Sequence, residues 1–292
     1  MSPPLVSIAM PFYNAESTMA ASIRSILRQS YDNWELLLCD DGSTDSGRDL
    51  ALSFDDPRIV VWGDRRRLEL GARLNECIAR ANGAYIARMD ADDIAYPRRL
   101  ERQVGFLEEH PQVDLAGGWA VLFSDSGAPV GKRADPAEHA DIARWPLHSF
   151  KLIHPTFMGR KSWFRRYGYR ADALRCEDHD LLFRSCQDSC FANMPEIVLG
   201  YRQGFMDLRK RLRSRWMWNR CAGRYLNPAG RLRVCAVETM KGCRDILAVA
   251  AHVDTAWIRA RCAALSDEEL REWRQVWSSV TRPEATSSRR ET

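Results

Sequence analysis

The chain has 292 residues, of which 45% are hydrophobic, so it can bury one large core or one core with a smaller appendage. Its net charge of +4 is unevenly distributed: residues 1–205 hold 25 Lys and Arg against 29 Asp and Glu, whereas residues 206–292 hold 18 against 10. These figures argue against gross disorder and against a uniformly basic nucleic-acid-binding surface.

The nine cysteines are scattered, odd in number and without a CxxC pair. This pattern argues against a zinc knuckle and a disulfide framework, and it favours a reducing cytoplasm. We find no signal-peptide pattern at the N-terminus, and the apolar runs fall short of the roughly 20 residues of a transmembrane helix. We therefore expect a cytoplasmic chain whose membrane contact is at most peripheral, at the inner face of the plasma membrane.

The first part of the chain alternates short apolar runs with helical periodicity, which is typical of βαβ units. The predicted strands are 6–12, 34–39, 58–63, 84–89 and 115–123. The predicted helices are 16–29, 45–54, 69–81 and 97–110, with Ser43 and Thr44 as candidate caps of the second. The pattern predicts an α/β fold with a mainly parallel sheet and helices on both faces.

A basic segment follows at residues 207–233, where nine basic residues stand against one acid, with Leu208, Leu212, Trp216 and Met217 among them. This predicts a basic helix with an apolar stripe, which could lie on an anionic membrane or pack on the preceding domain. Further helices are predicted at 236–253 and 266–280, the second opened by the capping box that begins at Ser266. The polar residues 281–292 are expected to be disordered.

Three acids, Asp90, Asp92 and Asp93, directly follow the predicted strand 84–89. Carboxylates this close repel each other unless a cation or several donors compensate their charge. The cluster predicts a divalent metal site, and its oxygen ligands favour Mn²⁺ or Mg²⁺ over zinc. The alternative is a group of acids that caps the next helix.

The first two predicted strands finish with the runs 11–14 and 40–43, each of which ends in polar residues. The carboxyl ends of parallel strands share one edge of a sheet, where ligands bind. A carboxylate there can accept hydrogen bonds from a uracil N–H or from ribose hydroxyls. The sequence therefore predicts a nucleotide-diphosphate site with a divalent cation, although Asp40 and Asp41 could instead form a plain turn.

The order of these motifs resembles the inverting family 2 glycosyltransferases of the GT-A fold. The matching runs lie within about residues 4–205, at 7–14, 39–45, 71–75, 81–93 with the DxD motif, 97–103, 154–158, 177–181 with the ED motif, and 201–203. The resemblance implies a catalytic domain at 1–205, with a nucleotide-sugar half at about 1–115 and an acceptor half at 116–205. A basic helical extension at 206–280 and the tail 281–292 would follow.

The resemblance also implies roles for individual residues. By the resemblance, the residues that contact the donor nucleotide are Pro11, Tyr13, Asn14, Asp40, Asp41 and Asp90. The implied metal ligands are Asp92, as the principal one, and Asp90. The catalytic carboxylates are Asp178, as general base, and Glu177, and the acceptor falls on His154 and Asp93. For Glu177 and Asp178 the alternative is a pair of acids that stabilises a helix N-terminus, and His154 could be a loop histidine without a ligand.

In an inverting transfer, an acceptor hydroxyl attacks the anomeric carbon opposite the leaving nucleoside diphosphate, without a covalent intermediate. A base must take the hydroxyl proton, and the diphosphate charge must be stabilised. We expect a nucleotide-sugar donor, a UDP-sugar first, and a glycan or lipid-linked acceptor in surface polysaccharide or glycolipid biosynthesis. The alternatives are an inactive nucleotide-binding scaffold of this fold and a sugar nucleotidyltransferase; nucleic acid is not an expected partner.

Overall fold

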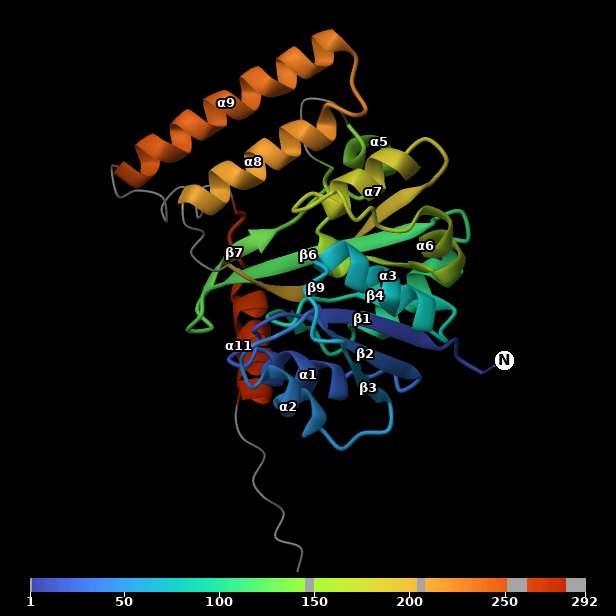
Figure 1. Cartoon of the computed structure of the whole chain (residues 1–292). Helices are drawn as coiled ribbons and strands as arrows, with labels where there is room; N and C mark the ends of the chain where they lie inside the picture. Colours follow the sequence, from blue (N-terminus) through green and yellow to red (C-terminus); the bar gives the residue numbers. More distant parts are fainter. Residues whose placement is uncertain (1, 145–149, 204–207, 251–261, 282–292) are drawn as a thin grey trace, which may run out of the picture.

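The computed structural model describes residues 2–144, 150–203, 208–250 and 262–281. A nine-stranded sheet forms its centre, with helices on both faces (Figure 1). The α/β class predicted from the sequence is confirmed.

The N-terminal half of the sheet is parallel and consists of β1 (Val6–Phe12), β2 (Trp34–Asp40), β3 (Ile59–Trp62) and β4 (Tyr85–Arg88), in the order β3-β2-β1-β4. Along β1, Ile8 and Met10 face one core while Ala9 faces another. A strand buried on both faces needs a continuous apolar run, which is the pattern that predicted these strands.

Four helices connect and cover these strands: α1 (Met19–Leu27), α2 (Gly47–Leu52), α3 (Leu70–Arg80) and α4 (Arg99–Glu109). Ile23 of α1 and Leu100 of α4 belong to one core, and Leu74 and Ile78 of α3 belong to the core on the opposite face. The helices are shorter than predicted at both ends, but their apolar faces are the predicted ones.

The predicted caps of α2 are wrong. The N-cap is Ser46, and no side chain caps the helix. Ser43 instead accepts a hydrogen bond from the Asn14 N–H at 3.1 Å, and the Thr44 N–H donates to Asn14 Oδ1 at 2.8 Å. A side chain near a helix start can serve either the helix or another loop, and here both residues join the loop after β2 to the loop after β1.

The C-terminal half of the sheet is mixed and consists of β5 (Ile94–Ala95), β6 (Leu115–Phe123), β7 (Pro129–Arg133), β8 (Met158–Arg160) and β9 (Phe191–Arg202). β8 lies antiparallel between β4 and β6, β9 pairs parallel with β6 and antiparallel with β5, and β7 pairs antiparallel with β6. The predicted mainly parallel order thus holds only for the N-terminal half. Antiparallel strands need no crossover helix, so the βαβ pattern does not extend to them.

Short helices cover the mixed half: α5 (His139–Ile142), the 3₁₀ helix η1 (His154–Thr156), α6 (Lys161–Tyr167) and α7 (Glu177–Ser185). Trp163 and Phe164 of α6 and Leu181 and Phe183 of α7 share a core with α3. This packing brings the start of α7 to the same side of the sheet as α3.

The C-terminal part begins with two helices, α8 (Leu208–Ala222) and α9 (Pro228–Ala250), that lie side by side (Figure 1). The single basic helix predicted at 207–233 is therefore wrong, because a new helix starts inside it. Pro228 suits a first helical position, and the Asn227 side chain accepts a hydrogen bond from the Gly230 N–H at 2.8 Å. Residues 207 and 251–253, which the predicted helices include, lie outside the described residues.

The last described helix, α11 (Asp267–Thr281), packs on the sheet. Trp273 and Val276 are buried in one cluster with Tyr96 and Phe123. The predicted capping box is confirmed: the Ser266 N–H donates to Glu269 at 2.7 Å, and the Glu269 N–H donates to Ser266 Oγ at 3.2 Å. The predicted domain bounds remain a prediction, and the tail beyond 281 lies outside the described residues.

Within the described residues, no helix combines the length and apolar character needed to cross a bilayer.

Candidate active site

The predicted acid cluster directly follows β4. Oxygen atoms of Asp90, Asp92 and Asp93 lie within 4.8 Å of one another, at the carboxyl edge of the parallel strands. Arg88, the last residue of β4, is buried and contacts Asp90 through both terminal nitrogens, at 2.7 and 2.5 Å. The structure thus brings the three acids together and gives one of them a fixed cationic partner.

The negative charge of this cluster is only partly compensated. Burial, followed by the charge of Asp90, raises the pKa of Asp92 to about 6. Burial, followed by the charges of Asp92 and Asp90, also raises the pKa of Asp93 well above its ordinary value. Asp93 Oδ1 accepts a hydrogen bond from the Arg202 N–H at 2.8 Å, while its buried Oδ2 has no hydrogen-bond partner among the described residues. Oxygen ligands with uncompensated charge fit a divalent cation, and Asp92 is the ligand that Arg88 leaves open.

The predicted acid pair opens α7, where negative charge is favourable with the helix dipole. Asp178 Oδ1 lies 2.8 Å from Nδ1 of His179. Burial would raise the pKa of Asp178, but the charge of His179 and this hydrogen bond hold the pKa below its ordinary value. Asp178 is therefore ionised at neutral pH, the state that a general base requires.

Glu177 differs from its neighbour. Burial raises the pKa of Glu177, and its Oε1 accepts a hydrogen bond from the Arg175 N–H at 3.0 Å. The two adjacent carboxyls thus have opposite pKa shifts, and Asp178 is the more acidic of the two.

His154 begins the 3₁₀ helix η1, which packs against β4. Its Nε2 is 2.9 Å from the hydroxyl of Tyr169. Burial, followed by the charge of Arg88, lowers the pKa of His154 well below its ordinary value, and the charge of Asp178 acts in the opposite direction. The charges of Arg88, next to the acid cluster, and of Asp178, on α7, thus both act on this ring. The other predicted acceptor residue, Asp93, is fully buried, and both acceptor roles stay predictions.

The two acids after β2 have different surroundings. Asp41 Oδ1 accepts hydrogen bonds from the Leu68 N–H at 2.7 Å and from Arg73 at 3.0 Å, and Oδ2 accepts one from the Glu69 N–H at 3.2 Å. Asp40 Oδ1 accepts one from the Ser43 N–H at 2.8 Å. Asp41 thus holds the loop before α3. Among the described residues, the cation nearest to Asp40 Oδ2 is Arg48, at 3.7 Å.

The residues after β1 lie next to this loop. Pro11 is buried and pairs with Cys39 of β2, whereas the Tyr13 ring is 45% exposed. The Arg67 guanidinium lies 3.5 Å from the centre of that ring. Asn14, with a positive φ of 50°, makes the contacts to the loop after β2 described above. The predicted nucleotide residues therefore form one rim.

Sequence reasoning missed the basic residues of the site, chiefly Arg88, Arg73 and Arg67. Arg73 is 1% exposed and also binds Asp64 at 2.6 Å. A usable signal existed for Arg88, because a lone basic residue in an apolar strand needs an acidic partner. No such signal marks Arg73, since α3 is amphipathic and its polar positions look alike in the sequence.

Helix α8 packs directly on α7. The Trp218 ring lies 4.6 Å from the His179 ring, edge to face, and 5.6 Å from the Phe183 ring. Beyond the end of α8, the Tyr225 hydroxyl donates to Asp180 at 2.6 Å. The α8–α9 hairpin is thus fixed to the helix that carries Asp178.

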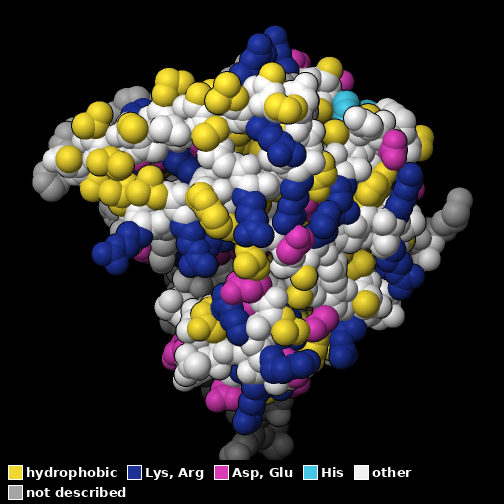
Figure 2. Space-filling model, turned by 45° about the horizontal axis from the view of Figure 1, so that its top comes forward, with side chains coloured by type: hydrophobic (Ala, Val, Ile, Leu, Met, Phe, Trp, Pro, Cys, Tyr) yellow, Lys and Arg dark blue, Asp and Glu magenta, His cyan; other side chains and the backbone are white. Residues whose placement is uncertain are grey.

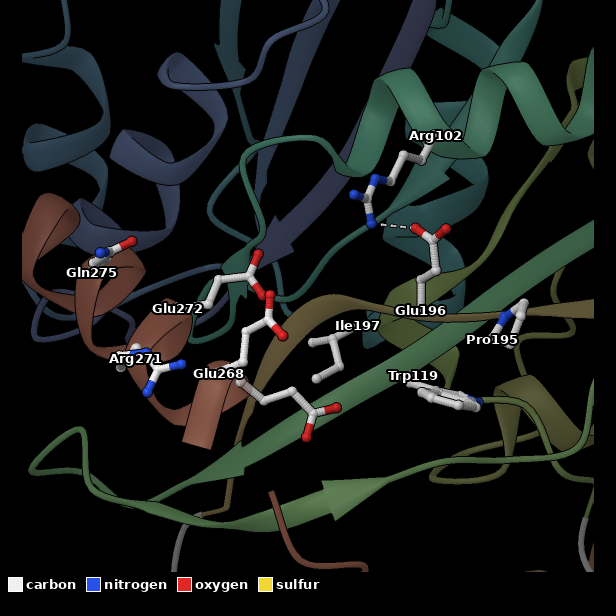
Figure 3. Close-up of a pocket in the computed structure, with 10 residues that line it drawn as sticks. Arg102, Trp119, Pro195, Glu196, Ile197, Glu268, Arg271, Glu272 and Gln275 are labelled. Atoms are coloured by element: carbon white, nitrogen blue, oxygen red, sulfur yellow. Dashed lines mark hydrogen bonds and ion pairs between the residues drawn. The ribbon is translucent and has the colours of Figure 1, made fainter. Parts of the chain in front are cut away.

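A cavity of about 580 Å³ lies elsewhere, between α4, β6, β9 and α11 (Figure 3). Figure 3 shows Arg102 facing Glu196, while Glu268 and Glu272 project from α11 beside the cavity. It contains none of the predicted site residues, so the candidate active site rests on the two acid motifs and the rim.

Comparisons with known proteins agree with this geometry. The profile of the family "Glycosyl transferase family 2" matches residues 7–168. The putative glycosyltransferase EpsE of Bacillus subtilis is 42% identical over 62% of this chain and 66% of its own length. The Escherichia coli UDP-Glc:alpha-D-GlcNAc-diphosphoundecaprenol beta-1,3-glucosyltransferase WfgD is 41% identical over 45% of this chain and 51% of its own. The chain thus spans just under two thirds of the first relative and about half of the second.

Among solved structures, Staphylococcus aureus TarS in complex with UDP has a TM-score of 0.57 at 15% identity, over 94% of this chain and 79% of TarS. At this identity the likeness concerns the fold alone. Together with the family match over more than half of the chain, it gives the identification: the chain belongs to the family 2 glycosyltransferases and has the GT-A fold.

Proposed function

We propose that this chain is a metal-dependent, inverting glycosyltransferase that moves a sugar from a nucleotide-diphosphate donor to an acceptor hydroxyl. The observation that supports the proposal is the cluster of Asp90, Asp92 and Asp93 after β4, together with an ionised Asp178 whose charge acts on the same histidine, His154, as that of Arg88. One group of acids suits a cation, and the single carboxylate suits proton transfer.

Each carboxylate has a separate task in the proposed transfer. Asp92, with Asp90, would hold Mn²⁺ or Mg²⁺, which when bound supplies positive charge to the leaving diphosphate. Asp178 takes the proton of the acceptor hydroxyl as its oxygen attacks the anomeric carbon. His179 keeps Asp178 ionised and oriented through the hydrogen bond of 2.8 Å.

The donor is proposed to bind along the rim of Pro11, Tyr13 and Asn14, with Asp40 as the acceptor for a nucleobase N–H or a ribose hydroxyl. Asp41 fits this role less well, because the loop and Arg73 already occupy both of its oxygens. We infer a UDP-sugar, since TarS was solved with UDP and with UDP-GlcNAc. His154 and Asp93 remain proposed contacts of the acceptor.

The acceptor is proposed to be a glycan or a lipid-linked sugar in surface polysaccharide assembly. WfgD, by its name, acts on a diphosphoundecaprenol-linked sugar. A cytoplasmic location and the choice of sugar stay predictions, because pocket side chains set specificity within one fold.

The first test is release of nucleoside diphosphate from a panel of UDP-, GDP- and dTDP-sugars with Mn²⁺, Mg²⁺ or EDTA. We expect one donor to be hydrolysed, and only with metal. If no donor reacts but a nucleotide with metal raises Tm, the acceptor is missing from the assay. If neither occurs, the chain binds no nucleotide sugar of the panel, and the proposed transfer is refuted.

The base is tested by a matched pair, Asp178→Asn and Glu177→Gln, each of which keeps the shape of its side chain. Asp178→Asn should lower kcat by about 10²–10⁴-fold with little change in the donor KM, because it removes the base and no donor contact. Glu177→Gln should change kcat by less than about tenfold. A larger loss in Glu177→Gln than in Asp178→Asn would move the base to Glu177.

A further inference from the structure

The outer face of α9 is apolar. Leu232, Met240 and Leu247 are 73%, 64% and 68% exposed. Ala236 and Cys243, which stand between them in the sequence, are also exposed. Each residue of this series follows the previous one by three or four positions, so together they form one stripe along the helix.

The acidic residues of α9 point the other way. Glu238 and Asp245 are buried against α8, where Arg215 binds them at 2.7 and 2.6 Å. A surface helix normally turns its apolar face to the core and its charges to water. In α9 this order is inverted, which marks its outer stripe as an interaction surface.

The exposed charge of the hairpin is entirely basic within residues 208–250. This segment holds 11 Lys and Arg against two acids, and the two acids are the buried pair. Figure 2 shows hydrophobic side chains along the hairpin with Lys and Arg beside them. Trp216 of α8 is 59% exposed, and the exposed arginines of the hairpin are Arg209, Arg213, Arg220, Arg231 and Arg233.

We propose that the α8–α9 hairpin docks on an anionic membrane surface through the outer stripe of α9. Apolar side chains enter the boundary between headgroups and acyl chains, and the arginines meet lipid phosphates. Within residues 208–250 the stripe is flanked only by exposed positive charge, which favours anionic lipid over a second copy of this chain, because two such hairpins would repel each other. The proposed contact lies mainly in α9. The sequence instead suggests residues 207–233 as the segment that could lie on a membrane.

Docking would also orient the active site. Trp218 and Tyr225 fix the hairpin to α7, so a hairpin on the membrane holds α7 close to it. This inference goes beyond the proposed function, because docking of the hairpin does not depend on which sugar the enzyme transfers.

The test is flotation of the full chain with vesicles of phosphatidylcholine alone or mixed with phosphatidylglycerol, at low and high salt. Wild type should float with the anionic vesicles, and less at high salt. The triple variant Leu232→Gln, Met240→Gln, Leu247→Gln should bind at least about tenfold more weakly. The control is Leu52→Gln on α2, where another exposed leucine (57%) lies outside the hairpin, and it should float like wild type.

Two further outcomes would overturn the proposal. Wild type that fails to float, or floats equally with neutral vesicles at any salt, excludes anionic lipid as the partner. A vesicle-free dimer that the triple variant converts to a monomer, seen by sedimentation, would assign the stripe to a second copy. Donor hydrolysis in the triple variant should equal that of wild type, so failure of docking is distinguishable from failure of the proposed chemistry.

Discussion

Asp92→Asn should stabilise the metal-free protein, although it removes the main proposed metal ligand. Asp92 has a pKa raised to about 6, whereas the same carboxyl titrates near 4 in an unfolded chain. A carboxyl with a raised folded pKa favours folding at low pH, and this contribution is lost as the pH rises through about 6. Asparagine keeps the size of the side chain and removes its charge.

The size of the effect follows from this pKa. A rise from about 4 to about 6 corresponds to about 3 kcal/mol at pH values well above 6. Because Asp92 titrates together with its acidic neighbours, about 1–3 kcal/mol is a fair range for one side chain. At about 2–4 °C per kcal/mol, Tm of Asp92→Asn should exceed that of wild type by about 2–12 °C in EDTA near pH 8. Near pH 5, where wild-type Asp92 is mostly protonated, the gain should shrink.

The difference in Tm is measured by thermal unfolding in EDTA at both pH values. Wild type is compared with Asp92→Asn and with the control Asp55→Asn, which changes an exposed surface acid. Added Mn²⁺ should then raise the Tm of wild type but not that of Asp92→Asn. The difference in Tm between the two proteins should therefore shrink or change sign. The reasoning is refuted if Asp92→Asn gains nothing in EDTA, or gains equally at both pH values.

Three further substitutions test the packing. Trp273→Ala should lower the free energy of unfolding by about 3–5 kcal/mol in urea, because the ring is fully buried. A loss below about 1 kcal/mol would mean that α11 contributes little to the stability of the core. Arg215→Ala should speed proteolysis of the hairpin, since it leaves Glu238 and Asp245 buried without their arginine; an unchanged cleavage rate would contradict this. Ser266→Ala should cost about 0.5–2 kcal/mol by loss of the capping box, whereas Ser266→Thr should stay near wild type.

The sequence was sufficient for the parallel half of the fold because its signals are local. Each strand bound there lies within one residue of its prediction, since these strands are rich in apolar residues and β1, β2 and β4 are almost wholly buried. The acid cluster was predictable for the same reason. Its three residues follow one strand, so their proximity depends on no long-range contact.

Other parts depend on contacts that a sequence pattern does not encode. The antiparallel β8 is three residues long and shows no crossover pattern. The pairing of Asp41 with Arg73 joins residues on separate elements, and nothing local links them. The inverted orientation of α9 depends on Arg215 of another helix, so periodicity revealed the helix but not which face is exposed.

The position of α11 has a consequence for how the protein forms during synthesis. Trp273 fills the space above Gly200 of β9, and Arg24 of α1 donates to the Val280 carbonyl at 3.2 Å. The core that holds the strand carrying Arg202 is thus closed by a helix translated after it. A ribosome-bound chain that has not yet released α11 still exposes Phe123 and Tyr96, so this core closes only after residue 280 has emerged.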